Sequence, residues 1–232
     1  MRAAALCCAL FLGACLNPNT YSTPRTTPVG EVQNAAALEV ISFRDSRYDE
    51  TSKSVHAQTS LVSPTYALRV GASDSVDIGA RIGNGSSLGV DVKWNFLKSK
   101  YFDMAAAPGM QTFYLWDGAG GDGGAAHFYG NLPLMLGINP SDSFSVVPSV
   151  GLGYGFGGGA AVANNAQERV AVTNALLLQA GIGLDFRTSP TFAIHPEMSL
   201  LRRVLGPADT DMIWFTFGLG FDWGALPRYA DR

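Results

Sequence analysis

Cysteine and charged residues are both scarce in this chain of 232 residues. The three cysteines, Cys7, Cys8 and Cys15, all lie at the N-terminus, so removal of the residues before Cys15 would exclude a disulfide within the chain. Charged residues make up only 15% of the sequence, and the formal net charge is −3. This mild acidity argues against a nucleic-acid partner, which would favour a basic face. The apolar run 3–12 is far shorter than the roughly 20 residues that a spanning helix needs.

The first residues have the pattern of a secretory signal: Arg2, the apolar run and then small residues. The sequence Leu12-Gly13-Ala14-Cys15 resembles the bacterial lipobox. This resemblance implies that residues 1–14 are a lipoprotein signal peptide and that Cys15 carries a covalent acyl and diacylglycerol group. Removing residues 1–14 deletes one base and no acid, so the net charge moves from −3 to −4. The alternative is an ordinary signal peptide followed by a free cysteine.

Residues 15–30 are predicted to be the lipidated cysteine followed by a flexible tether. This segment is rich in Pro, Thr and Asn, and its three prolines prevent regular helix or sheet ladders. Tyr21 and Arg25 could then touch lipid headgroups. Leu16 stands where an Asp would resemble the inner-membrane retention mark of enterobacterial lipoproteins, so the outer membrane is the expected destination.

Apolar residues alternate with polar or small ones along most of residues 31–223, which indicates β-strands. In 88–96, for example, Leu88, Val90, Val92, Trp94 and Phe96 share one face, and Gly89, Asp91, Lys93 and Asn95 share the other. About ten strands are predicted, near 31–43, 63–72, 76–83, 87–97, 101–114, 127–138, 144–156, 171–186, 192–203 and 211–223. Several are long enough to cross a bilayer when tilted, and aromatic residues gather near their ends. Both features favour a membrane barrel over a soluble periplasmic sandwich.

The connections show a regular asymmetry. The links 73–75, 98–100, 139–143 and 187–191 are short, whereas 44–62, 115–126, 156–170 and 205–210 are longer, and only 84–86 breaks the rule. Together with the aromatic final strand FTFGLGFDW, this pattern resembles the small outer-membrane β-barrels typified by OmpA-like and OmpX-like proteins. The resemblance covers residues 31–223 and implies an all-β, antiparallel, up-and-down transmembrane β-barrel of about ten strands, although eight would also keep the number even. Both termini would be periplasmic, residues 224–232 would be a short tail, and a monomer is expected.

The face opposite the apolar one would point into the lumen of the barrel. Its ionisable residues are Arg69, Asp77, Arg81, Asp91, Lys93, Asp103, Asp185, His195, Glu197, Arg203 and Asp222. We expect these charges to pair with one another, because an unpaired charge in a poorly hydrated interior is costly. Many other inward positions are glycine, which fits a tight lumen and strand curvature and could also leave a thin water path. A wide pore is not expected from about ten strands.

The best enzymatic candidate is the pair His195 and Glu197, with Ser199 on the same strand face as one nucleophile to consider. No G-x-S-x-G motif is present. Residues 118–124, GAGGDGG, lack the ending of a phosphate-binding loop, and no metal site or cofactor is indicated. We therefore expect a non-enzymatic, lipid-anchored outer-membrane barrel with a structural, surface-interaction or limited-permeability role and outer-membrane lipid as its surroundings. The alternatives are a narrow channel for water, ions or small solutes, and an outer-membrane lipid esterase or deacylase.

Overall fold

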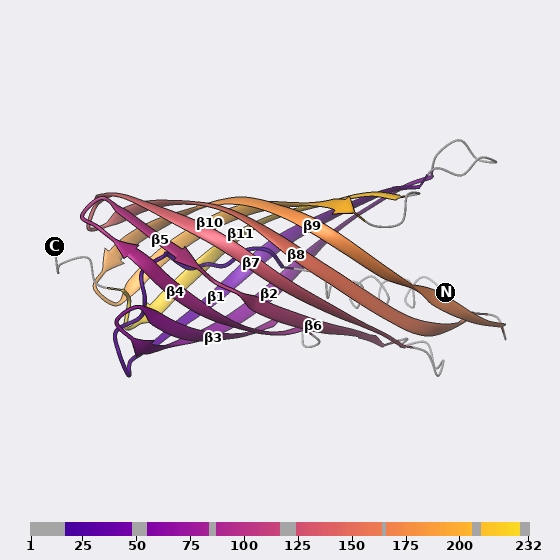
Figure 1. The fold of residues 1–232 in the computed structure, drawn as a ribbon, viewed down its shortest axis with the longest axis horizontal. Coiled ribbons are helices and arrows are strands. Elements are labelled where there is room, and N and C mark those ends of the chain that lie inside the picture. The colour runs from indigo at the N-terminus through magenta and orange to yellow at the C-terminus, as the bar shows by residue number, and fades with distance from the viewer. Residues whose placement is uncertain are drawn as a thin grey trace.

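The computed structural model describes residues 17–47, 55–83, 87–116, 124–163, 166–205 and 210–227. The predicted signal peptide and Cys15 lie outside these residues. The described chain forms one closed antiparallel barrel of ten strands, as predicted (Figure 1). In chain order the strand segments are β1 Val32–Arg47, β2 Val55–Ser73, β3 Val76–Gly83, β4 Ser87–Lys98, β5 Phe102–Ala106, β6 Gly109–Trp116, β7 Gly124–Ser141, β8 Phe144–Ala163, β9 Ala166–Ser189, β10 Phe192–Leu205 and β11 Thr210–Gly224.

Ten strands arise from eleven segments because β5 and β6 are two parts of one interrupted strand. Both segments pair with β4 on one side and with β7 on the other. The interruption falls at Ala107 and Pro108, where the proline ring removes a backbone donor from the ladder. The barrel closes where β1 pairs with β11, so the first and last strands of the chain meet at one seam.

The apolar face of the alternating pattern points outward, as predicted. Side chains such as Leu88, Trp94 and Leu152 are each more than half exposed. A surface with so many exposed large apolar side chains is that of a barrel surrounded by lipid. The described residues contain no helix that is long and apolar enough to cross a membrane.

The four short links are confirmed, because the strands end and restart at the predicted places: 73–76, 98–102, 141–144 and 189–192. The predicted long loops are shorter than expected. β8 and β9 continue to pair as far as Ala163 and Ala166, and β2 already begins at Val55. The backbone ladder thus continues beyond the alternating segments, because hydrogen-bond pairing does not need an apolar face. The Gly-rich loop is outside the described residues, except that its last residue begins β7.

The prediction of a flexible tether is wrong for residues 17–30, which we call the lumen segment. At the rim with the short links, the chain reverses at Gly30, whose φ is +75° and whose backbone N–H donates to the Gly71 carbonyl. From there back to Asn17 the segment runs inside the barrel (Figure 1), and most of its residues are buried. Tyr21 and Arg25 are only 5% and 8% exposed, so neither contacts headgroups. The prolines exclude regular pairing, and the inward polar side chains of the barrel satisfy the backbone instead.

Candidate functional site: the lumen and its segment

The end of the lumen segment nearest the short links is held by charged residues of the barrel wall. The Arg25 guanidinium pairs with Asp103, with 2.8 Å between Nε and Oδ2, and also donates to the Ser99 carbonyl. The backbone N–H of Thr27 donates to Asp77 at 3.1 Å. Because Arg25, Thr27, Asp77 and Asp103 are almost completely buried, the hydrogen bonds among them are shielded from competition with water.

Lys93 is the central contact of this region. Its buried ammonium donates to the Ser22 hydroxyl and to the carbonyls of Thr23 and Arg25, at 2.9, 2.9 and 2.7 Å. It also lies 3.1 Å from Asp77, which neutralises its charge. One wall residue thus uses the full donor capacity of its ammonium on the segment and on one partner acid.

Further toward the end with the long hairpins, two buried carboxylates hold the segment. Glu197 accepts the backbone N–H groups of Thr20 and Tyr21 at 2.9 and 2.6 Å. Glu39 accepts the side-chain amide of Asn17 with both of its oxygens at 2.7 Å. Three further wall residues donate to segment carbonyls: Arg81 to Asn19, Gln111 to Asn17 and Gln179 to Pro18.

Inward-facing glycines leave the space that the lumen segment occupies, which we call its seat. A Cβ atom at Gly220 would lie 2.6 Å from Cδ1 of Tyr21, and one at Gly218 would overlap the Tyr21 hydroxyl. A Cβ atom at Gly71 would overlap the carbonyl oxygens of Thr27 and Pro28. These glycines therefore do more than narrow the lumen or curve the strands, because each leaves the space that a segment residue occupies.

The predicted lumenal residues have several kinds of partner. Arg69 bridges two wall acids, Asp77 at 2.5 Å and Asp91 at 2.6 Å, as a salt-bridged network requires. Arg81, Lys93, Asp103 and Glu197 instead bind the lumen segment. Asp185, His195 and Asp222 gather in one buried cluster, and Arg203 lies half-buried on β10.

Sequence reasoning missed Glu39, Gln111 and Gln179 as functional residues. Each is almost fully buried, and each binds the end of the lumen segment near Asn17 and Pro18. Glu39 lies between Leu38 and Val40, which both point outward, so the period of two places it in the lumen. Alternation could therefore have found Glu39, but it could not have shown what Glu39 binds.

The enzymatic candidate is not assembled in the lumen. His195 Nε2 lies 3.7 Å from Glu197 Oε2, beyond hydrogen-bond distance. The Ser199 hydroxyl is buried and makes no hydrogen bond, so no base is in place to activate it. Both oxygens of Glu197 are already used by the lumen segment.

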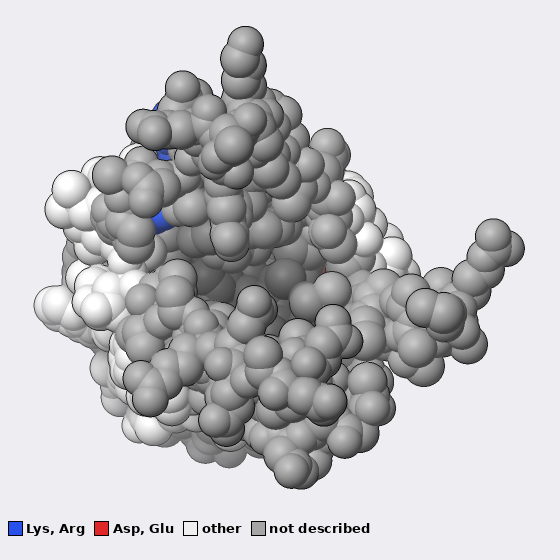
Figure 2. Space-filling view, turned by 90° about the vertical axis from the view of Figure 1, so that its right-hand side faces the viewer, with Lys and Arg blue, Asp and Glu red and all other residues white. Residues whose placement is uncertain are grey.

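Among the described residues, small cavities lie between the segment and the wall. Two internal cavities, beside Gln111 and beside Gln33, have volumes of about 10 and 20 Å³, and each can hold about one water molecule. Toward the long hairpins, Tyr129, Ala175, Leu177 and Leu201 form an apolar cluster inside the barrel, with Trp214 packed against it. In the view from that end, small patches of Lys or Arg are visible among the described residues (Figure 2).

Comparison with known proteins identifies the fold and no family. No family model and no curated protein matches the chain. Among solved structures, the outer-membrane protease OmpT from Escherichia coli aligns over 88% of this chain and 100% of its own, with 7% identity and a TM-score of 0.57. The translocator domain of the autotransporter NalP from Neisseria meningitidis aligns over 96% of both chains, with 11% identity and a TM-score of 0.48. Ail of Yersinia pestis aligns over 83% of this chain and 99% of its own, with 13% identity and a TM-score of 0.35. The likeness to OmpT shows that this chain has the fold of a bacterial outer-membrane β-barrel, and it shows the fold alone.

Proposed function

We propose that the protein is an outer-membrane β-barrel that its own N-terminal segment closes, with a structural or surface role and very limited permeability. The observation that carries this proposal is the burial of residues 17–27 inside the lumen. The large apolar side chains that face outward, and the fold that the chain shares with OmpT, support the membrane assignment. The long β8–β9 hairpin, whose pairing continues to Ala163 and Ala166, supports a surface role.

A channel role is less well supported, because the segment takes the path that a solute would use. Lys93, Glu197 and Glu39 direct their hydrogen bonds at the segment rather than at open water. Within the described residues, the cavities beside it hold single waters. Conduction would therefore require the segment to leave.

Conductance in planar lipid bilayers tests the proposal. We expect the refolded chain to give no conductance steps, and a variant lacking residues 17–27 to conduct. Heat-modifiable migration on a gel would show that the variant still forms a barrel. If it does not, Gly220→Ala, which displaces Tyr21, replaces it in the comparison. Regular conductance steps from the unmodified chain would contradict the closed lumen.

We also propose that the protein is not an esterase or deacylase. Ser199 lacks a hydrogen-bonded base, and Glu197 is engaged with the backbone of the lumen segment. Purified protein incubated with phospholipid is expected to release no fatty acid. Release that disappears in His195→Ala would contradict the non-enzymatic role.

The lumen segment changes what the proposed lipid on Cys15 could do. Asn17 binds Glu39 and Gln111 inside the barrel, and Cys15 lies two positions earlier in the chain. Two residues of extended chain span about 7 Å. A lipid on Cys15 could therefore enter the periplasmic leaflet only if the segment left the lumen. We propose that the seated segment and a periplasmic anchor are alternative states, and that the barrel alone holds the membrane in the seated state.

Labelling cells with radioactive palmitate tests whether Cys15 is acylated. Label that is absent from Cys15→Ser would identify the residue. The same variant is expected to remain with the outer membranes, because its barrel is unchanged. Loss of Cys15→Ser from the membrane fraction would show that the anchor, rather than the barrel, holds the protein.

A further inference from the structure

We propose that Asp185, His195 and Asp222 bind one divalent transition-metal ion, with Zn²⁺ as the probe, inside the barrel near the end with the short links. The three residues come from β9, β10 and β11, which are neighbours in the sheet. One donor atom from each residue lies within 4.8 Å of the other two. Imidazole and carboxylate are both ligands of such ions, whereas a set of oxygens alone would favour Mg²⁺ or Ca²⁺.

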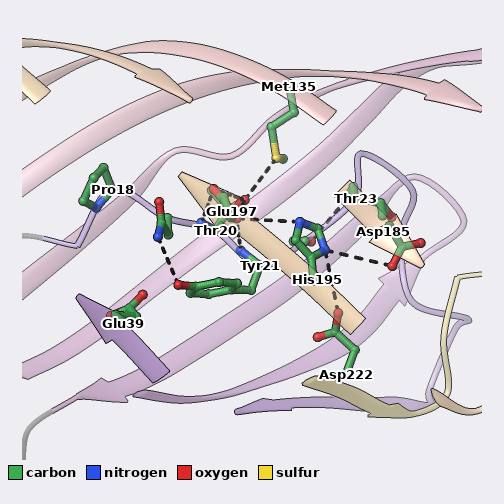
Figure 3. A network of polar contacts seen from close by, with 12 residues as sticks. Pro18, Thr20, Tyr21, Thr23, Glu39, Met135, Asp185, His195, Glu197 and Asp222 are labelled. Carbon is green, nitrogen blue, oxygen red and sulfur yellow. Dashed lines mark hydrogen bonds and ion pairs between the residues drawn. The ribbon is translucent and has the colours of Figure 1, made fainter. Parts of the chain in front are cut away.

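The first observation is the arrangement of donor atoms around one ring nitrogen. His195 Nδ1 lies 4.0 Å from Asp185 Oδ1 and 3.8 Å from Asp222 Oδ2 (Figure 3). Donors about 2.1 Å from a shared ion lie at most about 4.2 Å from one another. The observed separations are close to that limit, so rotations that move the donor atoms by less than about 1 Å would complete the coordination.

The second observation is that the histidine has no hydrogen-bond partner. His195 is 1% exposed, and neither of its ring nitrogens makes a hydrogen bond. Asp222 is 2% exposed, and its Oδ1 is also without a partner. Buried polar atoms normally have partners, since leaving one without a partner costs roughly 1–3 kcal/mol. Both carboxylates face the same ring nitrogen, and a single N–H could donate to only one of them at a time.

The charges around the imidazole favour a cation. The carboxylates of Asp185, Glu197 and Asp222 all lie within 4.0 Å of His195. Arg187 contacts Asp185, with 3.4 Å between Nε and Oδ2, and Lys93 acts on the cluster from a greater distance. Three buried carboxyl groups around one imidazole form a donor set whose negative charge a bound divalent ion would compensate.

The residues around the cluster leave room for the histidine ring, hold a carboxylate and cover the site. A Cβ atom at Gly183 would lie 2.5 Å from His195 Nε2, so the glycine leaves room for the ring. Arg187 contacts Asp185 from outside the cluster, which holds that carboxylate in place. The Tyr21 ring lies edge-on to His195 at 6.1 Å, so the seated lumen segment covers the cluster. Arg187 also lines a cavity of about 600 Å³ at the rim with the short links.

Equilibrium dialysis of the refolded, chelator-stripped full chain against Zn²⁺ tests the proposal. We expect about one bound ion per barrel, and at least a tenfold loss of affinity in Asp222→Asn and in His195→Asn. The matched control is Asp91→Asn, which removes a lumenal carboxylate that pairs with the wall residue Arg69 on β2, away from the cluster. This control should bind Zn²⁺ as the unmodified chain does.

Two further measurements keep the outcome decisive. Heat-modifiable migration shows whether each variant folds, and a variant that does not fold is replaced by Asp185→Asn. Substitution with Co²⁺ should give visible absorption bands that disappear in the cluster variants and persist in Asp91→Asn. The proposal is overturned if the unmodified chain binds no ion, or if the cluster variants bind as it does. In the former case a protonated His195 would balance the two aspartates instead.

Discussion

Replacing Gly220 by alanine should release the lumen segment from its seat. The new Cβ atom would lie 2.6 Å from Cδ1 of Tyr21 and 3.1 Å from the backbone oxygen of His195, and real Cβ contacts are not that close to a ring carbon. The strand backbone is fixed by pairing on both sides, so Tyr21 has to move. Tyr21 is 5% exposed, and its N–H donates to Glu197 at 2.6 Å.

The expected magnitude follows from these two contacts. Exposing the Tyr21 side chain costs about 2 kcal/mol. Loss of one hydrogen bond to the buried Glu197 carboxylate costs about 1.5–3 kcal/mol. Together they favour release of the segment by about 4 kcal/mol, which raises the released population by about a thousandfold.

Trypsin cleavage after Arg25 measures this population. Arg25 is 8% exposed inside the lumen, so the protease can cut only when the segment is out. When opening and closing are fast, the cleavage rate follows the open population. Mass spectrometry of the Arg25–Thr26 bond separates this cut from cuts elsewhere. Gly220→Ala should be cleaved at least a hundredfold faster than the unmodified chain.

The matched control is Gly155→Ala, at an inward-facing position on β8. A Cβ atom there would have no neighbour closer than 3.9 Å, so cleavage after Arg25 should be unchanged. The reasoning is refuted if folded Gly220→Ala resists trypsin as the unmodified chain does. Rapid cleavage after Arg25 in the unmodified chain would equally refute it, because the segment would then be outside.

Three other substitutions address separate parts of the structure. Lys93→Met removes three hydrogen bonds to the segment and one of the two cations beside Asp77. The free energy of unfolding should therefore fall by about 3 kcal/mol. An unchanged temperature of heat-modification would contradict this. Glu197→Gln weakens two charge-assisted hydrogen bonds to the backbone of the lumen segment by about 1–2 kcal/mol in total. Cleavage after Arg25 should therefore be about tenfold faster. An unchanged cleavage rate would show that Glu197 does not hold the segment. Leu152→Arg on the lipid face should cost about 2–4 kcal/mol in urea unfolding from lipid vesicles. Thr188→Arg, at the exposed end of β9 beside a short link, should cost little. Equal effects would argue against an apolar face in contact with lipid.

The barrel could be predicted because apolar and polar residues alternate with a period of two along its strands. In a strand whose two faces meet different surroundings, alternate residues must differ, and Leu88 to Phe96 show this directly. The interruption between β5 and β6 was not expected, although Pro108 marks the place where the ladder loses a donor. The inward apolar residues Leu177 and Leu201 were missed as well, because a continuous apolar run interrupts the alternation without showing that its inward members form a cluster.

The lumen segment could not be predicted from its own composition. A stretch rich in Pro, Thr and Asn has no period, and it suits both a solvated tether and a chain held by polar walls. The difference lies in the wall. Gly71, Gly218 and Gly220 leave space, while Glu39 and Gln179 add donors and acceptors that the wall alone does not satisfy. The Asp185, His195 and Asp222 cluster was equally hidden, because three strands in register bring together residues without any motif spacing.

The segment also joins the two sides of the seam that closes the barrel. Tyr21 packs into the space left by Gly218 and Gly220 on β11, while Asn17 binds Glu39 on β1, the strand paired with β11. Since the same short stretch contacts both strands, any opening of the seam would separate contacts that the seated segment holds together. Binding of the segment in the lumen and pairing of β1 with β11 therefore stabilise each other by the same free energy, because the two equilibria are linked. A variant that releases the segment should accordingly lose part of its barrel stability even though every strand is intact, which a segment that only filled space would not require.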